Sequence, residues 1–103
     1  MPTRLCELAA LESGLPCQVV LPSGHQLAVF FVGGEVFVTD DVCTHGEASL
    51  AEGLVEGYEV ECPYHQGRFD IRTGAATAAP CTSPLRTYPV LVREGSVFLD
   101  DTQ

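Results

Sequence analysis

The chain has 103 residues, a length that is too short to bury two separate cores. Its hydrophobic content of 46%, with no Trp, is ordinary for a compact soluble protein. Fourteen acidic residues stand against five Arg and no Lys, so the formal net charge at pH 7 is −9. This charge makes nucleic acids and anionic membranes poor partners, and it favours a protein partner with a basic docking face.

Membrane and export signals are weak throughout the sequence. The longest run without a polar residue or Gly is Leu27–Val32, six residues, against the roughly 20 that cross a bilayer. The first residues, Met1–Gly14, lack a basic segment followed by an apolar one, so we expect no signal peptide. These observations favour a cytoplasmic protein without a membrane anchor.

Runs of β-branched, aromatic and aliphatic residues between Gly- and Pro-containing turns predict short strands. In chain order the predicted strands are 3–8, 17–21, 26–32, 35–39, 58–62, 68–71, 85–93 and 97–100, with at most one helical turn at 9–13. The predicted turns are 22–25, 33–34 and 94–96. Short strands closed by tight turns are typical of an all-β fold, here an antiparallel sandwich or barrel.

Two short motifs, Cys43-Thr44-His45 and Cys62-Pro63-Tyr64-His65, each combine one thiolate and one imidazole ligand. Zinc fingers usually pair like ligands, Cys with Cys and His with His. The mixture within each motif suits a binuclear iron–sulfur cluster in which two Cys hold one iron and two His hold the other. The candidate ligands for the metal and the cofactor are therefore Cys43, His45, Cys62 and His65.

The neighbourhood of these motifs resembles the Rieske ferredoxins of bacterial aromatic-ring-hydroxylating dioxygenases, such as those of carbazole and naphthalene dioxygenases. Segments 41–46 and 61–70 resemble the two cluster loops, and 48–53 resembles the linker between them. Thr73-Gly74 and Ala79-Pro80 resemble the segment called the proline loop. The similarity extends from about residue 40 to residue 92.

The resemblance implies a Rieske fold and one 2Fe–2S cluster held by the four candidate ligands. It also implies a one-electron carrier, acting between a flavin-dependent ferredoxin reductase and a terminal Rieske oxygenase, with transient docking of a monomer near His45 and His65. We expect a single domain over residues 1–103. The Gly-, Ala- and Pro-rich region of about 41–82 is expected to form a small cluster-binding subdomain inserted into the barrel.

Catalytic signals are missing from the sequence. We find no nucleophile–base arrangement, no phosphate-binding Gly loop and no 2-His-1-carboxylate iron site, so we do not expect an enzyme. In high-potential respiratory Rieske proteins the sequence of the second loop resembles C-P-C-H-G-S, with a Ser two residues after the His. This chain has Gln66-Gly67 after the His instead. The missing Ser donor predicts a potential near the low end of the Rieske range, which is about −150 to +300 mV.

Several residues outside the motifs have simpler interpretations. Cys6, Cys17 and Cys81 are expected to be small buried hydrophobes. His25 falls in a predicted hairpin turn with no ligand type nearby in sequence, and we interpret it as a solvated turn residue. The acidic residues around the first motif form either a docking surface or an ordinary solvated surface; they are Asp40, Asp41, Glu47, Glu52 and Glu56.

Two other functions compete with the electron carrier. The same four ligands suit a zinc-stabilised β domain, which would be colourless where a Rieske protein is red-brown. The other alternative is a redox sensor or a small accessory subunit like that of assimilatory nitrite reductases. Those subunits often lack the ligands, whereas all four candidate residues are present here.

Overall fold

The computed structural model describes residues 3–43, 48–63, 67–79 and 83–100, and the regular secondary structure of these residues is almost entirely β-strand. The strands are β1 (Thr3–Glu7), β2 (Cys17–Val20), β3 (Gln26–Val32), β4 (Glu35–Asp40), β5 (Leu54–Glu56), β6 (Glu59–Glu61), β7 (Arg68–Asp70), β8 (Ala76–Ala78), β9 (Thr87–Tyr88), β10 (Val90–Arg93) and β11 (Ser96–Leu99). Two short 3₁₀ helices, η1 (Leu8–Leu11) and η2 (Leu50–Glu52), complete the described elements. The predicted all-β class is confirmed.

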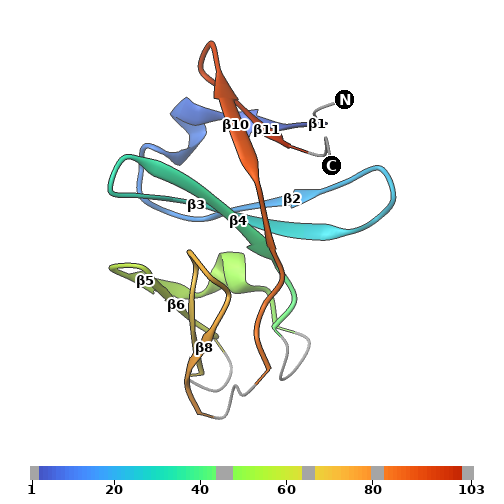
Figure 1. The fold of residues 1–103 in the computed structure, drawn as a ribbon. Helices are drawn as coiled ribbons and strands as arrows, with labels where there is room; N and C mark the ends of the chain where they lie inside the picture. Colours follow the sequence, from blue (N-terminus) through green and yellow to red (C-terminus); the bar gives the residue numbers. More distant parts are fainter. Residues whose placement is uncertain (1–2, 44–47, 64–66, 80–82, 101–103) are drawn as a thin grey trace.

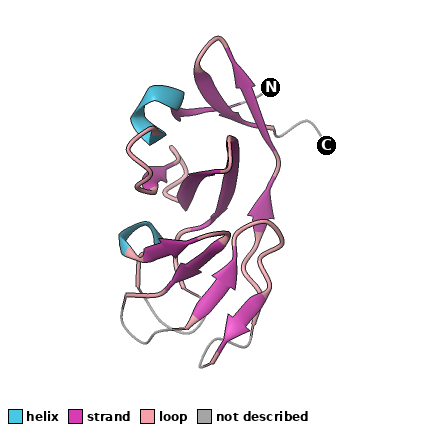
Figure 2. Cartoon of the chain, turned by 90° about the vertical axis from the view of Figure 1, so that its left-hand side faces the viewer, coloured by secondary structure: helices cyan, strands magenta, loops and turns pink. Residues whose placement is uncertain are grey.

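Three antiparallel sheets are stacked along the long axis of the molecule (Figure 1). Their strand orders are β1-β11-β10, β2-β3-β4-β9 and β5-β6-β7-β8. The first sheet lies at the end where the termini are, and the third lies at the opposite end (Figures 1 and 2). None of the described helices is both long and apolar enough to span a bilayer.

Strand β3 is buried on both faces, which explains its unbroken apolar sequence. Side chains alternate between the faces of a strand, so Ala28 and Phe30 enter one core cluster while Leu27 and Val29 enter another. The cluster toward the third sheet also holds Phe69, and the other holds residues of β1, η1 and β11. The described core therefore has two parts that share one central strand, where the sequence predicted a single core.

The predicted turn at Gly33-Gly34 is confirmed, because both residues have positive φ (62° and 82°), as a tight hairpin turn requires. The single predicted strand over 85–93 is wrong. Pro89 has no N–H to donate to a sheet, and the chain changes sheets there, so that β9 pairs with β4 while β10 pairs with β11.

The sequence prediction missed β5, β8 and η2, all of three residues. Three residues are too few to display a recognisable hydrophobic period. The third sheet is nevertheless continuous, because β6 pairs with both β5 and β7, and β7 also pairs with β8.

Gly74 lies between β7 and β8, and a hydrogen bond connects it to the segment before β9. Its carbonyl accepts a hydrogen bond from the Leu85 N–H (2.7 Å), and a Cβ at position 74 would collide with the Leu85 carbonyl oxygen. Its φ of +82° is also a conformation that glycine adopts more easily than other residues. Both constraints require glycine at this position.

Candidate metal centre

Two of the four predicted ligands, Cys43 and Cys62, are buried in the same part of the core. Their exposed fractions are 3% and 1%, and both belong to the cluster that contains Phe30 and Phe69. Cys43 follows β4 and Cys62 follows β6, so segments 19 residues apart in the chain bring their thiols into one apolar cluster. Soft thiolate ligands in a region from which water is excluded suit an iron–sulfur cofactor.

Each of these cysteines begins a loop that is closed at its base by a backbone hydrogen bond. The Cys43 N–H donates to the Ala48 carbonyl (3.0 Å), and the Cys62 N–H donates to the Gly67 carbonyl (2.8 Å). Both bonds connect residues five positions apart, so the two loops have equal length. The first encloses position 45 and the second encloses position 65.

His45 and His65 themselves lie outside the described residues, as do Glu47 and Cys81. An extended chain advances at most about 3.3–3.6 Å per residue. The Cα atoms of His45 and His65 are therefore within roughly 7 and 11 Å of those of Cys43 and Cys62. That reach is compatible with binding one binuclear group, and the four-ligand set stays a prediction.

Asp41 anchors the first loop and corrects our interpretation of the acidic residues. Its side chain is completely buried (0% exposed), so it cannot belong to a docking surface. The carboxylate accepts hydrogen bonds from the Ser49 hydroxyl (2.8 and 2.9 Å), the Gln18 side-chain amide (2.7 Å) and the Ala51 N–H (2.9 Å). Sequence could not separate this buried carboxylate from the exposed Glu52 and Glu56, because all three occur in one acidic region.

A charged pair flanks the second loop. Glu61 precedes Cys62, Arg68 follows Gly67, and the two face each other across β6 and β7, with Arg68 Nη2 2.9 Å from Glu61 Oε1. The same guanidinium contacts Glu56 at 2.7 Å and Glu59 at 3.6 Å. The hydrogen bond to Glu56 and then that to Glu61 raise the pKa of Arg68. One cation is therefore shared by three carboxylates, so this group of four side chains carries a net negative charge.

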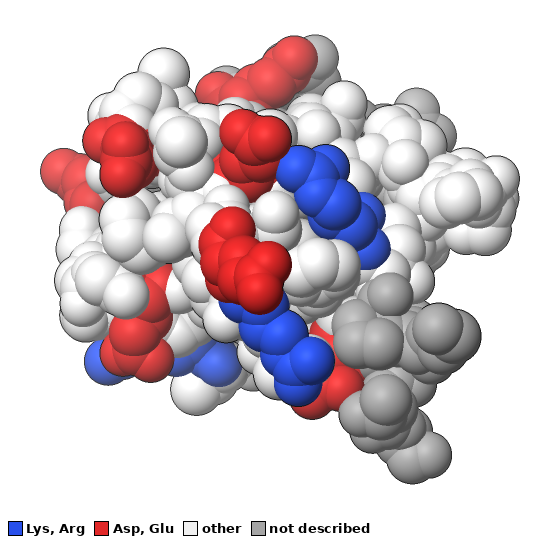
Figure 3. Space-filling view, turned by 90° about the horizontal axis from the view of Figure 1, so that it is seen from above, with Lys and Arg blue, Asp and Glu red and all other residues white. Residues whose placement is uncertain are grey.

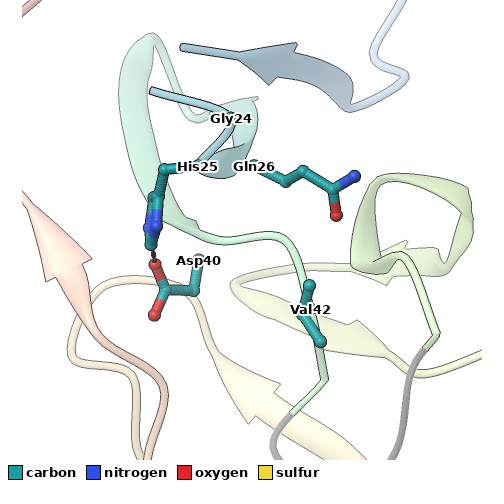
Figure 4. A pocket seen from close by; sticks show the side chains of 5 residues that line it. All are labelled: Gly24, His25, Gln26, Asp40 and Val42. Atoms are coloured by element: carbon teal, nitrogen blue, oxygen red, sulfur yellow. Dashed lines mark hydrogen bonds and ion pairs between the residues drawn. The ribbon is translucent and has the colours of Figure 1, made fainter. Parts of the chain in front are cut away.

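A hollow of about 250 Å³ lies beside the residues that lead into the first loop (Figure 4). It is lined by Gly24, His25, Gln26, Asp40 and Val42. His25 Nε2 lies 2.7 Å from Asp40 Oδ1 and 3.0 Å from the Tyr88 hydroxyl, which donates to the same oxygen at 2.5 Å. The side chain of His25 is 48% exposed in the predicted turn, as expected for a solvated residue, but it also contacts β4 and β9, which the sequence did not predict.

Two causes raise the pKa of Tyr88 to about 12: burial is the larger, and the hydrogen bond to Asp40 is the next. In the unfolded chain a tyrosine titrates near 10. Since the folded pKa is the higher one, the stabilisation is fully present below about pH 10 and is lost as the pH rises toward 12. We expect urea titrations of wild type and Tyr88→Phe to show a steeper loss of stability between pH 10 and 12 in the wild type. Parallel pH profiles would contradict this assignment.

Comparison with known proteins settles the family. A model of the Rieske [2Fe–2S] domain matches residues 2–89. The chain belongs to the Rieske [2Fe–2S] domain family. The cofactor of this Rieske domain is one 2Fe–2S cluster, which is consistent with the pair of buried thiols.

Individual relatives narrow the function. The ferredoxin component of the p-cumate 2,3-dioxygenase system of Pseudomonas putida is 57% identical over 97 residues, covering 93% of this chain and 82% of that protein. The structure of Sphingomonas yanoikuyae B1 ferredoxin matches with a TM-score of 0.93 and 48% identity, over 98% of this chain and 99% of that one.

A complex of reduced oxygenase and oxidized ferredoxin in carbazole 1,9a-dioxygenase matches with a TM-score of 0.89 and 39% identity, over 95% of this chain and 91% of that one. These relatives are electron carriers, so the predicted class of Rieske ferredoxin of aromatic dioxygenase systems is confirmed. This Rieske protein is an electron-transfer component and not a catalytic enzyme.

The remaining cysteines differ from one another. Cys6 is buried as predicted, and desolvation raises the pKa of its thiol. Cys17, which was also predicted to be buried, is only half-buried at the edge of the core cluster that contains Cys6, and neither thiol is bonded to another described cysteine. Among the described residues, which do not include His45 and His65, no three or more His, Cys, Asp or Glu side chains are arranged to hold a metal ion.

Proposed function

We propose that this protein takes single electrons from a flavin-dependent ferredoxin reductase and delivers them to a terminal ring-hydroxylating oxygenase. In this proposal Cys43 and Cys62 hold one iron of the cluster, and His45 and His65 hold the other. The observation that supports it best is the pair of buried cysteines, each at the base of an equally long closed loop. A cluster with this ligand set supplies reversible one-electron transfer at about −150 to +300 mV.

The protein's own residues would hold that group in a dry, fixed environment. Phe30 and Phe69 pack in the cluster that contains both thiols, and this packing excludes water from the cysteine side. The bonds from Cys43 to Ala48 and from Cys62 to Gly67 fix the base of each loop. A rigid site changes little in geometry when the charge changes, which favours rapid electron transfer.

Docking is proposed at the end of the molecule where the third sheet lies. Glu52 and Glu56 are exposed there, and Arg68 is already engaged by three glutamates. On the face at the opposite end, acidic and basic side chains lie side by side (Figure 3). On β1 of the first sheet, Arg4 pairs with Glu7. Arg72 also pairs with Asp70 at the third-sheet end, but the three glutamates around Arg68 leave an excess of negative charge there that would attract a partner with a basic face.

The test is the salt dependence of electron transfer to a purified ring-hydroxylating oxygenase. We expect the stopped-flow rate to fall about tenfold as ionic strength rises well past ~0.1 M, where the Debye length is about 10 Å. Glu52→Arg should slow association at low salt and reduce the salt dependence. Rates that stay level with salt would indicate an apolar docking face instead.

Glu35→Arg is the matched control, since it makes the same charge change at an exposed position. Glu35 begins β4 whereas Cys43 follows its other end, about 17 Å away for six residues of strand. It should alter the association rate less than Glu52→Arg. Equal effects of the two reversals would argue against a localised docking site. A monomeric state and a cytoplasmic location belong to the same proposal, and sedimentation and cell fractionation test them.

A further inference from the structure

The Asp41 carboxylate is the most completely enclosed charged group among the described residues, and its partners are donors. The Ala51 N–H can only donate, the Gln18 amide nitrogen donates to Oδ2, and the Ser49 hydroxyl lies within 2.9 Å of both oxygens. An ionised carboxylate accepts at both oxygens, whereas a protonated one must donate at one of them. This donor set is therefore complementary to the charged form.

These bonds hold the segment that carries Cys43. Residues 41–43 run antiparallel to 48–50, through Leu50 N–H to the Asp41 carbonyl (2.7 Å), the bridge between Val42 and Ser49, and the bond from Cys43 to Ala48. The carboxylate adds a side-chain connection to η2: Ser49 stands at its N-cap but makes no capping bond, and Asp41 receives the Ala51 N–H instead. Removing this connection would delete the side-chain bonds that join the segment before Cys43 to η2.

The charge of Asp41 also lies close to Cys43 in the chain. Two residues of extended chain separate their Cα atoms by at most about 7 Å. A buried charge is screened much less by salt than an exposed one. Reduction adds negative charge to the group that Cys43 would hold, so a nearby fixed anion opposes reduction.

We propose that Asp41 is a positioning residue of the electron-transfer site, whose carboxylate fixes the Cys43 loop and whose negative charge lowers the reduction potential of the cluster. The proposal rests on the proposed function, because it takes Cys43 as a ligand. Coulomb's law at an effective dielectric constant of about 20 still gives a sizeable interaction between unit charges at such short range, so we expect roughly a tenfold effect on the equilibrium between reduced and oxidised forms. For one electron, tenfold corresponds to about 59 mV.

Asp41→Asn tests the charge, because an amide can keep most of the hydrogen bonds once the Gln18 amide rotates. We expect the variant to keep the visible and reduced-state EPR signals and to have a potential about 59 mV more positive by voltammetry, the tenfold effect above. Glu52→Gln is the matched control, since it removes one charge from an exposed position in the same segment, and it should shift the potential much less. Equal shifts in the two variants would overturn the role of the charge.

The double variant Gln18→Glu with Asp41→Asn covers the case in which Asp41→Asn does not fold. It exchanges the carboxylate and the amide, keeping their hydrogen bond while moving the charge to an exposed position. We expect a smaller rise in potential in the same direction. No rise would overturn the proposal.

Ser49→Ala tests positioning with the charge intact, because it deletes the hydroxyl that contacts both carboxylate oxygens. We expect severalfold faster loss of the cluster to a chelator, with restoration by Ser49→Thr, which keeps a hydroxyl. Equal rates in wild type and Ser49→Ala would overturn the positioning role. A wild-type protein without a Rieske spectrum would instead overturn the proposed function itself.

Discussion

Replacing any one of the four proposed ligands should abolish the red-brown colour and the reduced-state EPR signal of low average g value. The variants are Cys43→Ser, His45→Ala, Cys62→Ser and His65→Ala. In each variant one of the two irons would lose one of its two protein ligands. Because cluster binding is coupled to folding, each variant should also unfold at a lower urea concentration than the wild type.

The control variants remove the same residue types elsewhere in the chain: His25→Ala, Cys6→Ser, Cys17→Ser and Cys81→Ser. They should keep both the colour and the EPR signal, although His25→Ala should cost some stability because it deletes the contacts to Asp40 and Tyr88. A control that bleached while a ligand variant stayed red would overturn the ligand assignment. A colourless wild type with stoichiometric zinc would favour the zinc-stabilised domain over the electron carrier.

The sequence predicted those parts of the fold in which local pattern and tertiary structure agree. The apolar run at 27–32 could be predicted as a strand, because a central strand that is buried on both faces carries apolar residues throughout and shows no polar alternation. The Gly33-Gly34 turn follows from the positive φ that both positions require. The four-ligand motif was recognisable because thiolate and imidazole side chains at such short spacings have few structural alternatives.

What sequence missed depends on contacts between distant segments. Asp41 looks like its acidic neighbours until Gln18, 23 residues away, and Ser49 enclose it. His25 has no acidic neighbour in the chain, yet Asp40 lies 2.7 Å from it in space. Strands β5 and β8 have too few residues for a periodic pattern, and they exist because β6 and β7 offer them hydrogen-bonding edges.

Phe69→Ala should give the second large effect. Phe69 is fully buried between Val60 on β6 and Ala76 on β8, in the cluster that contains both proposed cysteine ligands. Truncating a buried Phe costs about 3–5 kcal/mol, a large part of the roughly 5–15 kcal/mol that stabilises a typical domain. Chemical denaturation of the purified holoprotein measures this loss.

Leu11→Ala is the matched comparison, because Leu11 is equally buried but lies in the other core cluster, and its truncation costs about 2–5 kcal/mol. If residues 41–82 form a locally cooperative subdomain, Phe69→Ala should release the 2Fe–2S cluster to a chelator much faster than Leu11→Ala does, at a similar loss of global stability. Both core clusters share β3, however, so the subdomain cannot open without exposing Ala28 and Phe30. Equal rates of 2Fe–2S cluster release at equal stability would mean that the shared strand makes the two core clusters unfold as one unit. The proposed subdomain boundary would then have no energetic meaning.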